Sequence, residues 1–383
     1  MKILTKVTAL FLMVFLFTNC EDDGPQFQNA GPQFNMDLFE QNIIDYVNFG
    51  TADPIGWGYA INQNGQLARS NAYGDARTDA DGQLDFTLGK EANVASVSKF
   101  YTAIGAMQLI YANGLTIDST ISKWLPDSWA QGPGVSNLTF KDLLTHTSGL
   151  QSANNDFSNT LSYAGLQACI ATGVINPKTR NYLNANFALF RILIPSLWEP
   201  LSNYAINIEV DANTQFMYLL YMQENVWDVI DLPLVGCMPE ARTSCTLYYN
   251  VSDAGTSNTG AYYGDWNPIC GGGGYFMSLF EMAKLNAYFE HTEDLLTDEL
   301  KQVMKDNRIG MDSADPSDEL HGKYYSKNGS ISNGAGQGVL TQIAMFPASG
   351  VEIAINMNSQ GAVFQGNVSL RQMIFDAYNN AWE

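Results

Sequence analysis

Residues 94–100 read Val-Ala-Ser-Val-Ser-Lys-Phe and lead into a strongly helical pattern over residues 97–112. Ser96 and Lys99 are three residues apart, so a helix projects both side chains from one face. A serine hydroxyl is a weak nucleophile that needs an adjacent base, and a lysine can serve when burial and nearby cations lower its pKa. No other lysine in the 383-residue chain has a serine three residues before it. The stretch therefore predicts a nucleophilic serine at the start of a helix.

A second segment, Tyr182-Leu183-Asn184, offers a base. A tyrosine beside ammonium groups ionises more easily and can then accept a proton. Asn184 could orient Lys99 or an amide of the substrate. The Tyr-x-Asn pattern also occurs elsewhere in the chain, and the order of the segments selects Tyr182.

A third segment, Lys327-Asn328-Gly329, is the only Lys-x-Gly sequence present, and it precedes a predicted hairpin. A lysine at a strand end can hold a substrate carboxylate, and a glycine beside it lets the backbone approach closely. We expect Lys327 either to bind a carboxylate or to tune Tyr182.

Patterns around these segments predict an α/β (α+β) fold in which terminal helices flank an antiparallel sheet and an all-α lobe is inserted. The middle of the chain reads as mostly helical, so we expect an α/β lobe at about 36–95 and 311–383 and an α lobe at about 96–310, with the site between them. The predicted elements are helices at 36–49 and 366–381 and hairpins at 56–73 and 338–357.

These motifs, in this order, resemble the serine β-lactamase and penicillin-binding-protein superfamily, and specifically its class C β-lactamase-related branch. Residues 141–150, Lys-Asp-Leu-Leu-Thr-His-Thr-Ser-Gly-Leu, are similar to the Leu-Leu-x-His-Thr-Ser-Gly-Leu segment of that branch. Residues 271–278 resemble its Gly-Gly-Leu-x-Ser-Thr element. The resemblance covers roughly residues 37–380 and implies a β-lactamase/transpeptidase-like fold.

The resemblance implies a serine hydrolase that forms an acyl-enzyme on an amide or ester and needs no metal or organic cofactor. Ser96 would be the nucleophile, and Lys99 with Tyr182 would take its proton. Ser330 would supply the second oxyanion N–H, because the residue after the Lys-x-Gly glycine does so in this family. Asn184, Lys327 and Gly329 would complete the substrate-binding set.

The substrate remains open among β-lactams, D-amino-acid peptides and small esters. Asn328 stands where the family often has threonine, which removes a hydroxyl that would contact substrate, and residues 200–213 resemble an insertion. A catalytically silent cell-envelope binding lipoprotein of the same fold is the alternative. His146 reads as a structural loop residue, because the chain has no Gly-x-Ser-x-Gly segment of the kind that a Ser-His-Asp triad would require.

The charge and histidine content limit the partners. The formal net charge of −20 disfavours nucleic acid as a partner. The chain has three histidines, and none has the spacing of a zinc hydrolase, so no metal site is predicted. The expected partner is a small-molecule or peptide substrate, and the sequence leaves the oligomeric state open.

The N-terminus has the features of an export signal. Residues 1–19 read as a signal peptide, with two lysines before an apolar run that is too short to span a bilayer. Cys20 follows directly and resembles a bacterial lipoprotein's lipidation site, so residues 20–35 would be a lipidated tether before a domain at 36–383. We expect an exported lipoprotein at the outer membrane or cell surface, with the periplasm as the alternative, that touches the membrane only through its lipid.

Four cysteines follow Cys20, namely Cys169, Cys237, Cys245 and Cys270. Export permits disulfides, and a bond from Cys237 to Cys245 would close a short loop. The pairing stays open, and four buried thiols are the alternative.

Overall fold

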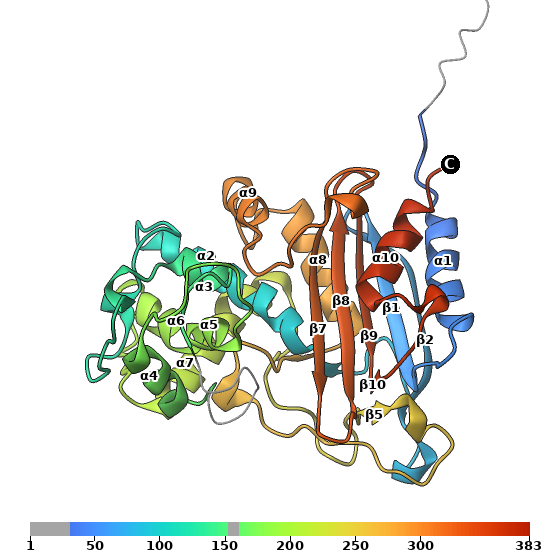
Figure 1. Cartoon of the computed structure of the whole chain (residues 1–383), viewed down its shortest axis with the longest axis horizontal. Helices are drawn as coiled ribbons and strands as arrows, with labels where there is room; N and C mark the ends of the chain where they lie inside the picture. The colour runs from blue at the N-terminus through green and yellow to red at the C-terminus, as the bar shows by residue number, and fades with distance from the viewer. Residues whose placement is uncertain (1–30, 152–160) are drawn as a thin grey trace, which may run out of the picture.

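The computed structural model describes residues 31–151 and 161–383. A lobe built on an antiparallel sheet lies beside a lobe made mostly of helices (Figure 1). The predicted signal peptide, Cys20 and most of the predicted tether lie outside the described residues. Across the two described ranges, no helix is both long enough and apolar enough to cross a bilayer.

Two hairpins from opposite ends of the chain form the centre of the sheet. The first consists of β1 (Gly56–Gln63) and β2 (Gln66–Arg77), and the second of β8 (Gly338–Phe346) and β9 (Val351–Met357). They join because β1 pairs antiparallel with β9. The strand β7 (Tyr325–Ser332) pairs antiparallel with β8 and brings the Lys-x-Gly segment to the side of the helical lobe (Figure 1). The predicted fold class is confirmed.

Short strands complete the order β10-β5-β8-β9-β1-β2-β3, and one further pair, β4 with β6, lies apart from it. They are β3 (Leu84–Asp85), β4 (Ala92–Asn93), β5 (Tyr249–Asn250), β6 (Phe276–Met277) and β10 (Ser359–Gln360).

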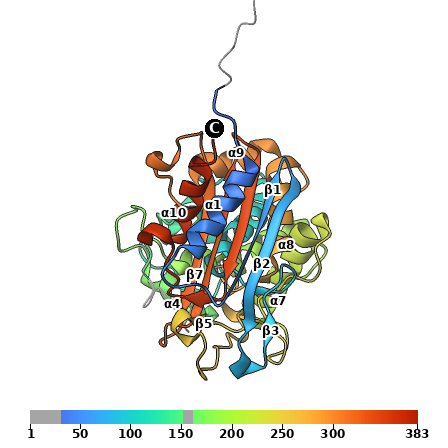
Figure 2. The same cartoon turned by 90° about the vertical axis from the view of Figure 1, so that its right-hand side faces the viewer.

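Helices cover both faces of the sheet, because its central strands are apolar on both sides. The terminal helices α1 (Met36–Asn48) and α10 (Leu370–Asn379) lie side by side on the outer face (Figure 2). The helix α8 (Leu279–His291) packs on β1, β8 and β9, where Gly58 of β1 lies directly against Leu279. The expected limit of the α lobe near residue 310 therefore needs correction. The terminal helices cover only one apolar face of the sheet. The helix α8, from the middle of the chain, covers the other face and so belongs to the sheet lobe.

The folded domain also begins slightly before residue 36. Gln33 and Glu383 exchange two backbone hydrogen bonds of 2.6 and 3.0 Å. Phe34 packs against the rings of Phe39, Tyr378 and Trp382. The last residues of the predicted tether are therefore part of the sheet lobe, because an aromatic side chain there finds an apolar surface at the C-terminus.

The helical lobe is organised around α2 (Ser98–Ala112), whose residues are almost all buried. Packed around or near it are α3 (Phe140–Leu144), α4 (Tyr163–Thr172), α5 (Asn184–Ala188), α6 (Phe190–Trp198), α7 (Asp211–Met222) and α9 (Asp298–Asn307). Gly105 allows close packing, since a Cβ there would lie 2.7 Å from the sulfur of Met222 on α7. The segment 200–213 ends in the first turn of α7, where Asp211 forms an ion pair with the buried Arg191 at 2.5 Å.

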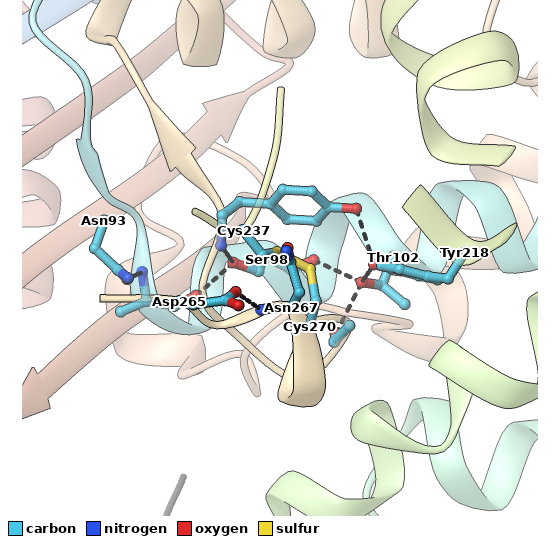
Figure 3. The surroundings of a disulfide bond; sticks show 11 residues. Asn93, Ser98, Thr102, Tyr218, Cys237, Asp265, Asn267 and Cys270 are labelled. Carbon is cyan, nitrogen blue, oxygen red and sulfur yellow. Dashed lines mark hydrogen bonds between the residues drawn. A yellow bond between two sulfur atoms is a disulfide. The ribbon is translucent and has the colours of Figure 1, made fainter. Parts of the chain in front are cut away.

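The disulfide joins Cys237 to Cys270, so the bond from Cys237 to Cys245 suggested by the sequence is wrong (Figure 3). Their Cα atoms lie 6.0 Å apart, and the Trp266 N–H donates to the Cys237 carbonyl at 2.7 Å, which holds the two segments side by side. Cys245 is a buried free thiol that packs in a separate small apolar cluster, and Cys169 is also free and buried. Loop packing between residues 33 positions apart decided the pairing, and sequence spacing does not report it.

Candidate active site

Ser96 lies in a single 3-10 turn, η2 (Ala95–Val97), that runs directly into α2. Ala95 has a φ of 46°, in the left-handed region that non-glycine residues rarely adopt. Two hydrogen bonds hold it there. The Ala95 N–H donates to Asn93 Oδ1 at 2.7 Å, and the Ser98 hydroxyl donates to the Ala95 carbonyl at 2.7 Å. Such strain persists only where its surroundings enforce it, and here it fixes the backbone that presents Ser96.

The structure brings Lys99 and Tyr182 onto the Ser96 hydroxyl. Lys99 Nζ donates to Ser96 Oγ at 3.0 Å, and the Tyr182 hydroxyl donates to the same oxygen at 2.8 Å. Tyr182 comes from the segment just before α5, 86 residues away along the chain. The three residues predicted to react together are therefore in direct contact.

Lys99 is completely buried and surrounded by acceptors. Besides Ser96 Oγ, its ammonium donates to Asn184 Oδ1 at 2.9 Å and to the Gly272 carbonyl. These oxygens hold the ammonium group beside Tyr182, with which it also interacts. Burial, assisted by the charge of Lys327, lowers the pKa of Lys99, while its interaction with Tyr182 acts in the opposite direction. Asn184 thus contacts Lys99, one of the two partners that the sequence suggested for it, whereas the sequence did not indicate Gly272.

Tyr182 lies between two ammonium groups. Lys99 Nζ is 5.0 Å and Lys327 Nζ is 5.6 Å from the centre of its ring. Burial acts to raise the pKa of Tyr182, but the two ammonium charges and the hydrogen bonds from Lys99 and Ser96 lower it below its ordinary value. Since 38% of the residue's surface remains exposed, the ring also borders the open side of the site.

His146 packs against the Tyr182 ring and binds the backbone of the next residue, Leu183. Its ring is buried, with its centre 4.4 Å from that of the Tyr182 ring, and its Nδ1 accepts the Leu183 N–H at 3.3 Å. Burial, together with the charges of Lys99, Lys327 and Arg180, lowers the pKa of His146 well below its ordinary value. A neutral ring that accepts a backbone N–H beside Tyr182 matches the structural role inferred from the sequence.

The strand β7 places the Lys-x-Gly segment against η2. A Cβ at Gly329 would lie 2.7 Å from the Val94 carbonyl and 2.5 Å from Thr341, so only glycine permits this close approach. The next residue, Ser330, accepts a hydrogen bond on its hydroxyl from Gln360 at 2.9 Å. The predicted use of the Ser330 N–H as an oxyanion donor stays a prediction.

Lys327 has partners that the sequence did not indicate. Its ammonium donates to Asp312 Oδ1 at 2.7 Å, to the Asn328 carbonyl at 2.8 Å and to Asn328 Oδ1 at 2.9 Å. Asp312 precedes Lys327 by 15 residues, outside any regular element, and no pattern in the chain marks it. Among the residues described, no group of three or more His, Cys, Asp or Glu could hold a metal ion.

Part of the chain matches a known protein family. Residues 49–197 match the family model described as Beta-lactamase. No curated protein matches the chain. Several hundred solved chains match it, and the three described next share its fold at low sequence identity.

FmtA from Staphylococcus aureus is 16% identical, with a TM-score of 0.67 over 92% of this chain and 91% of that one. A class C β-lactamase from Rhodobacter sphaeroides is 15% identical, with a TM-score of 0.62 over 90% and 98%. A D-stereospecific amidohydrolase from Streptomyces sp. is 16% identical, with a TM-score of 0.58 over 89% and 98%.

The family match over residues 49–197 and the shared fold support the serine β-lactamase and penicillin-binding-protein superfamily that the sequence motifs predicted. Assignment to the class C-related branch stays a prediction. These similarities favour hydrolase chemistry in general and leave the substrate to be inferred from the site.

Proposed function

We propose that this protein is a serine hydrolase that forms an acyl-enzyme at Ser96 on an amide or ester substrate. The observation that carries the proposal is the convergence of the Lys99 ammonium and the Tyr182 hydroxyl on Ser96 Oγ, at 3.0 and 2.8 Å. A nucleophile and its base within hydrogen-bond reach, with the base oriented by further groups, is the arrangement that covalent catalysis requires.

In the first step, Ser96 Oγ attacks the substrate carbonyl while its proton passes to Tyr182, acting together with Lys99. The two ammonium groups near Tyr182 favour its ionised form, so it can accept the proton at a lower pH than an ordinary tyrosine could. The N–H groups of Ser96 and Ser330 are proposed to bind the oxyanion of the tetrahedral intermediate. The same proton is then delivered to the leaving amine or alcohol as the carbonyl–heteroatom bond breaks.

In the second step, water attacks the acyl-enzyme and loses a proton to Tyr182 with Lys99. That proton returns to Ser96 Oγ when the acid product leaves, which restores the starting state. The proposed chemistry uses no metal or organic cofactor.

Intact-mass spectrometry on the chain from residue 21, treated separately with a fluorophosphonate and a penicillin, tests this proposal. We expect a fluorophosphonate adduct on the parent and none on Ser96→Ala. A penicilloyl adduct on the parent alone would indicate a penicillin-binding, peptidase-like enzyme, and labelling by fluorophosphonate alone would favour an esterase. A folded parent that gains no mass from either reagent would contradict the proposal and favour the silent binding lipoprotein.

We also propose that the protein is exported and anchored through a lipidated Cys20, which would keep the domain on the surface of a membrane. The proposal rests on the N-terminal sequence. Expression of the full chain in a bacterium supplied with an alkyne-labelled fatty acid should label the parent but not Cys20→Ser, and equal labelling of both would exclude this anchor.

A further inference from the structure

The ammonium of Lys327 has all three of its donors occupied by the protein itself. It contacts Asp312 Oδ1, the Asn328 carbonyl and Asn328 Oδ1 at 2.7, 2.8 and 2.9 Å. An ammonium group has three N–H donors and no more. A substrate carboxylate that needed Lys327 would therefore have to displace one of these acceptors.

Asp312 is held firmly in this position. Its N–H donates to the Ser326 carbonyl at 2.8 Å, and its second carboxylate oxygen accepts the Asn328 N–H at 2.7 Å. Both carboxylate oxygens thus have a partner on β7. The side chains of Lys327 and Asp312 are only 2% and 14% exposed, so water screens their interaction weakly.

The charges around Lys327 determine whether a substrate carboxylate can bind there. The negative charge of Asp312 lies beside the Lys327 ammonium, and it would repel a substrate carboxylate that bound the same ammonium. Arg180 is another cation, whose charge acts on His146, and its guanidinium donates to the backbone carbonyls of Thr145 and Met311 at 3.2 and 3.4 Å. If Arg180 bound a substrate carboxylate, the parent enzyme would already prefer acidic substrates.

We infer that Asp312 is a specificity-determining residue that occupies Lys327 and makes this site select uncharged ester or amide substrates over carboxylate-bearing ones. The inference rests on the proposed function and refines its substrate class. Lys327 then acts through its charge on Tyr182, 5.6 Å away, instead of as a carboxylate anchor. A β-lactam, which carries a carboxylate next to its amide, would be a poor substrate for the same reason.

A matched pair of esters tests the inference. One is an acyl ester of 3-hydroxybenzoic acid, and the other carries the same acyl group on methyl 3-hydroxybenzoate, so the pair differs in charge and little else. On the parent we expect kcat/KM for the neutral ester to exceed that for the acid by at least about tenfold, which corresponds to about 1.4 kcal/mol. In Asp312→Asn that ratio should fall about tenfold, mostly through a lower KM for the acid.

Two further variants separate a local effect from a general one. Asp315→Asn removes the same charge from an acid three positions away whose side chain accepts two hydrogen bonds from Ser317, and it should leave the ratio at the parental value. Asp312→Glu keeps the carboxylate and should retain a preference for the neutral ester. An equal fall of the ratio in Asp315→Asn would assign the effect to net charge and overturn the inference.

The parent alone can also overturn it, even if Asp312→Asn does not fold. Ser96-dependent turnover of the acid as fast as the neutral ester would exclude the inference while leaving the proposed function intact. Absence of both turnover and fluorophosphonate labelling in a folded parent would instead contradict the proposed function, and the inference with it.

Discussion

Two buried lysines lie near the Tyr182 ring, and they are held in different ways. Lys99, at the start of α2, donates to a serine hydroxyl, an asparagine side-chain oxygen and a backbone carbonyl. Lys327, on β7, donates to a carboxylate and to two oxygens of Asn328. Lys99 thus contacts neutral oxygens and also interacts with Tyr182, whereas Lys327 is paired with the Asp312 carboxylate.

This difference separates two functions that one residue type can perform. Burial lowers the pKa of Lys99 although its interaction with Tyr182 acts in the opposite direction, and this suits a group that shares protons with Tyr182 and Ser96. Lys327 instead has a carboxylate partner in Asp312 and lies 5.6 Å from the centre of the Tyr182 ring. Lys99 is thus suited to proton transfer, and Lys327 to electrostatic support of Tyr182.

The largest expected effect follows from removing the proton-sharing lysine. Lys99→Met should lower kcat/KM for a neutral ester by about 10³-fold, because general base catalysis contributes on the order of 10²–10⁴-fold. Steady-state kinetics and the rate of fluorophosphonate labelling should fall together. Lys123→Met, at an exposed position, is the matched control and should stay near the parental rate. A loss of less than about tenfold for Lys99→Met would contradict the proposed role of Lys99 in proton transfer.

The disulfide should stabilise the loop that supplies one of the acceptors of Lys99. Cys270 is followed by Gly271 and Gly272, whose carbonyls accept from Thr102 at 2.8 Å and from Lys99. Replacing Cys237 and Cys270 by serine opens a loop of 33 residues and should lower the free energy of unfolding by about 3–4 kcal/mol in the chain-entropy treatment. Denaturant titration measures the loss, and Cys245→Ser, which removes a free thiol, should cost less than half as much. Equal losses in both variants would contradict a stabilising role for the bond.

Removal of the other lysine should mainly affect stability. Lys327→Met leaves the Asp312 carboxylate, of which only 14% is exposed, without its ammonium partner, and should cost about 2 kcal/mol of unfolding free energy. Adding Asp312→Asn should restore about half of that loss, because the unpaired charge is then gone. A double variant no more stable than Lys327→Met would show that the ion pair is not what Lys327 contributes to stability.

The smallest expected effect is a pH dependence of stability caused by His146, whose pKa responds to burial and to the charges of both lysines. Burial and the ammonium charges lower its pKa in the folded protein below that of the unfolded chain. Above about pH 6.5 the ring is neutral in both states, so the group has no effect. Below that pH only the unfolded chain takes up the proton, so stability should fall by about 1.4 kcal/mol per pH unit until the folded-state pKa is reached.

His146→Asn should reduce this slope, since asparagine keeps an acceptor for the Leu183 N–H and tolerates the φ of 58° found at this position. Denaturant titrations of both proteins between about pH 5 and 7 measure the difference. An unchanged slope would assign the acid sensitivity to other groups.

The sequence alone determined the features that depend on local spacing. Ser96 and Lys99 share a helix face because they are three residues apart, and the turn residues between apolar runs located both central hairpins. Tyr182 and Asn184 were found because their order relative to the other motifs is characteristic of the family. In each case a few neighbouring residues carry the signal.

Tertiary structure alone decided the partners that come from distant segments. Asp312 beside Lys327, the Gly272 carbonyl beside Lys99, the bond from Cys237 to Cys270 and the position of α8 under the sheet have no periodic signature. An ion pair, a carbonyl acceptor or a disulfide requires proximity in space only, and that proximity arises when the apolar faces of the strands and helices pack. The sequence therefore predicted which residues could react, and the fold determined which charges and acceptors surround them.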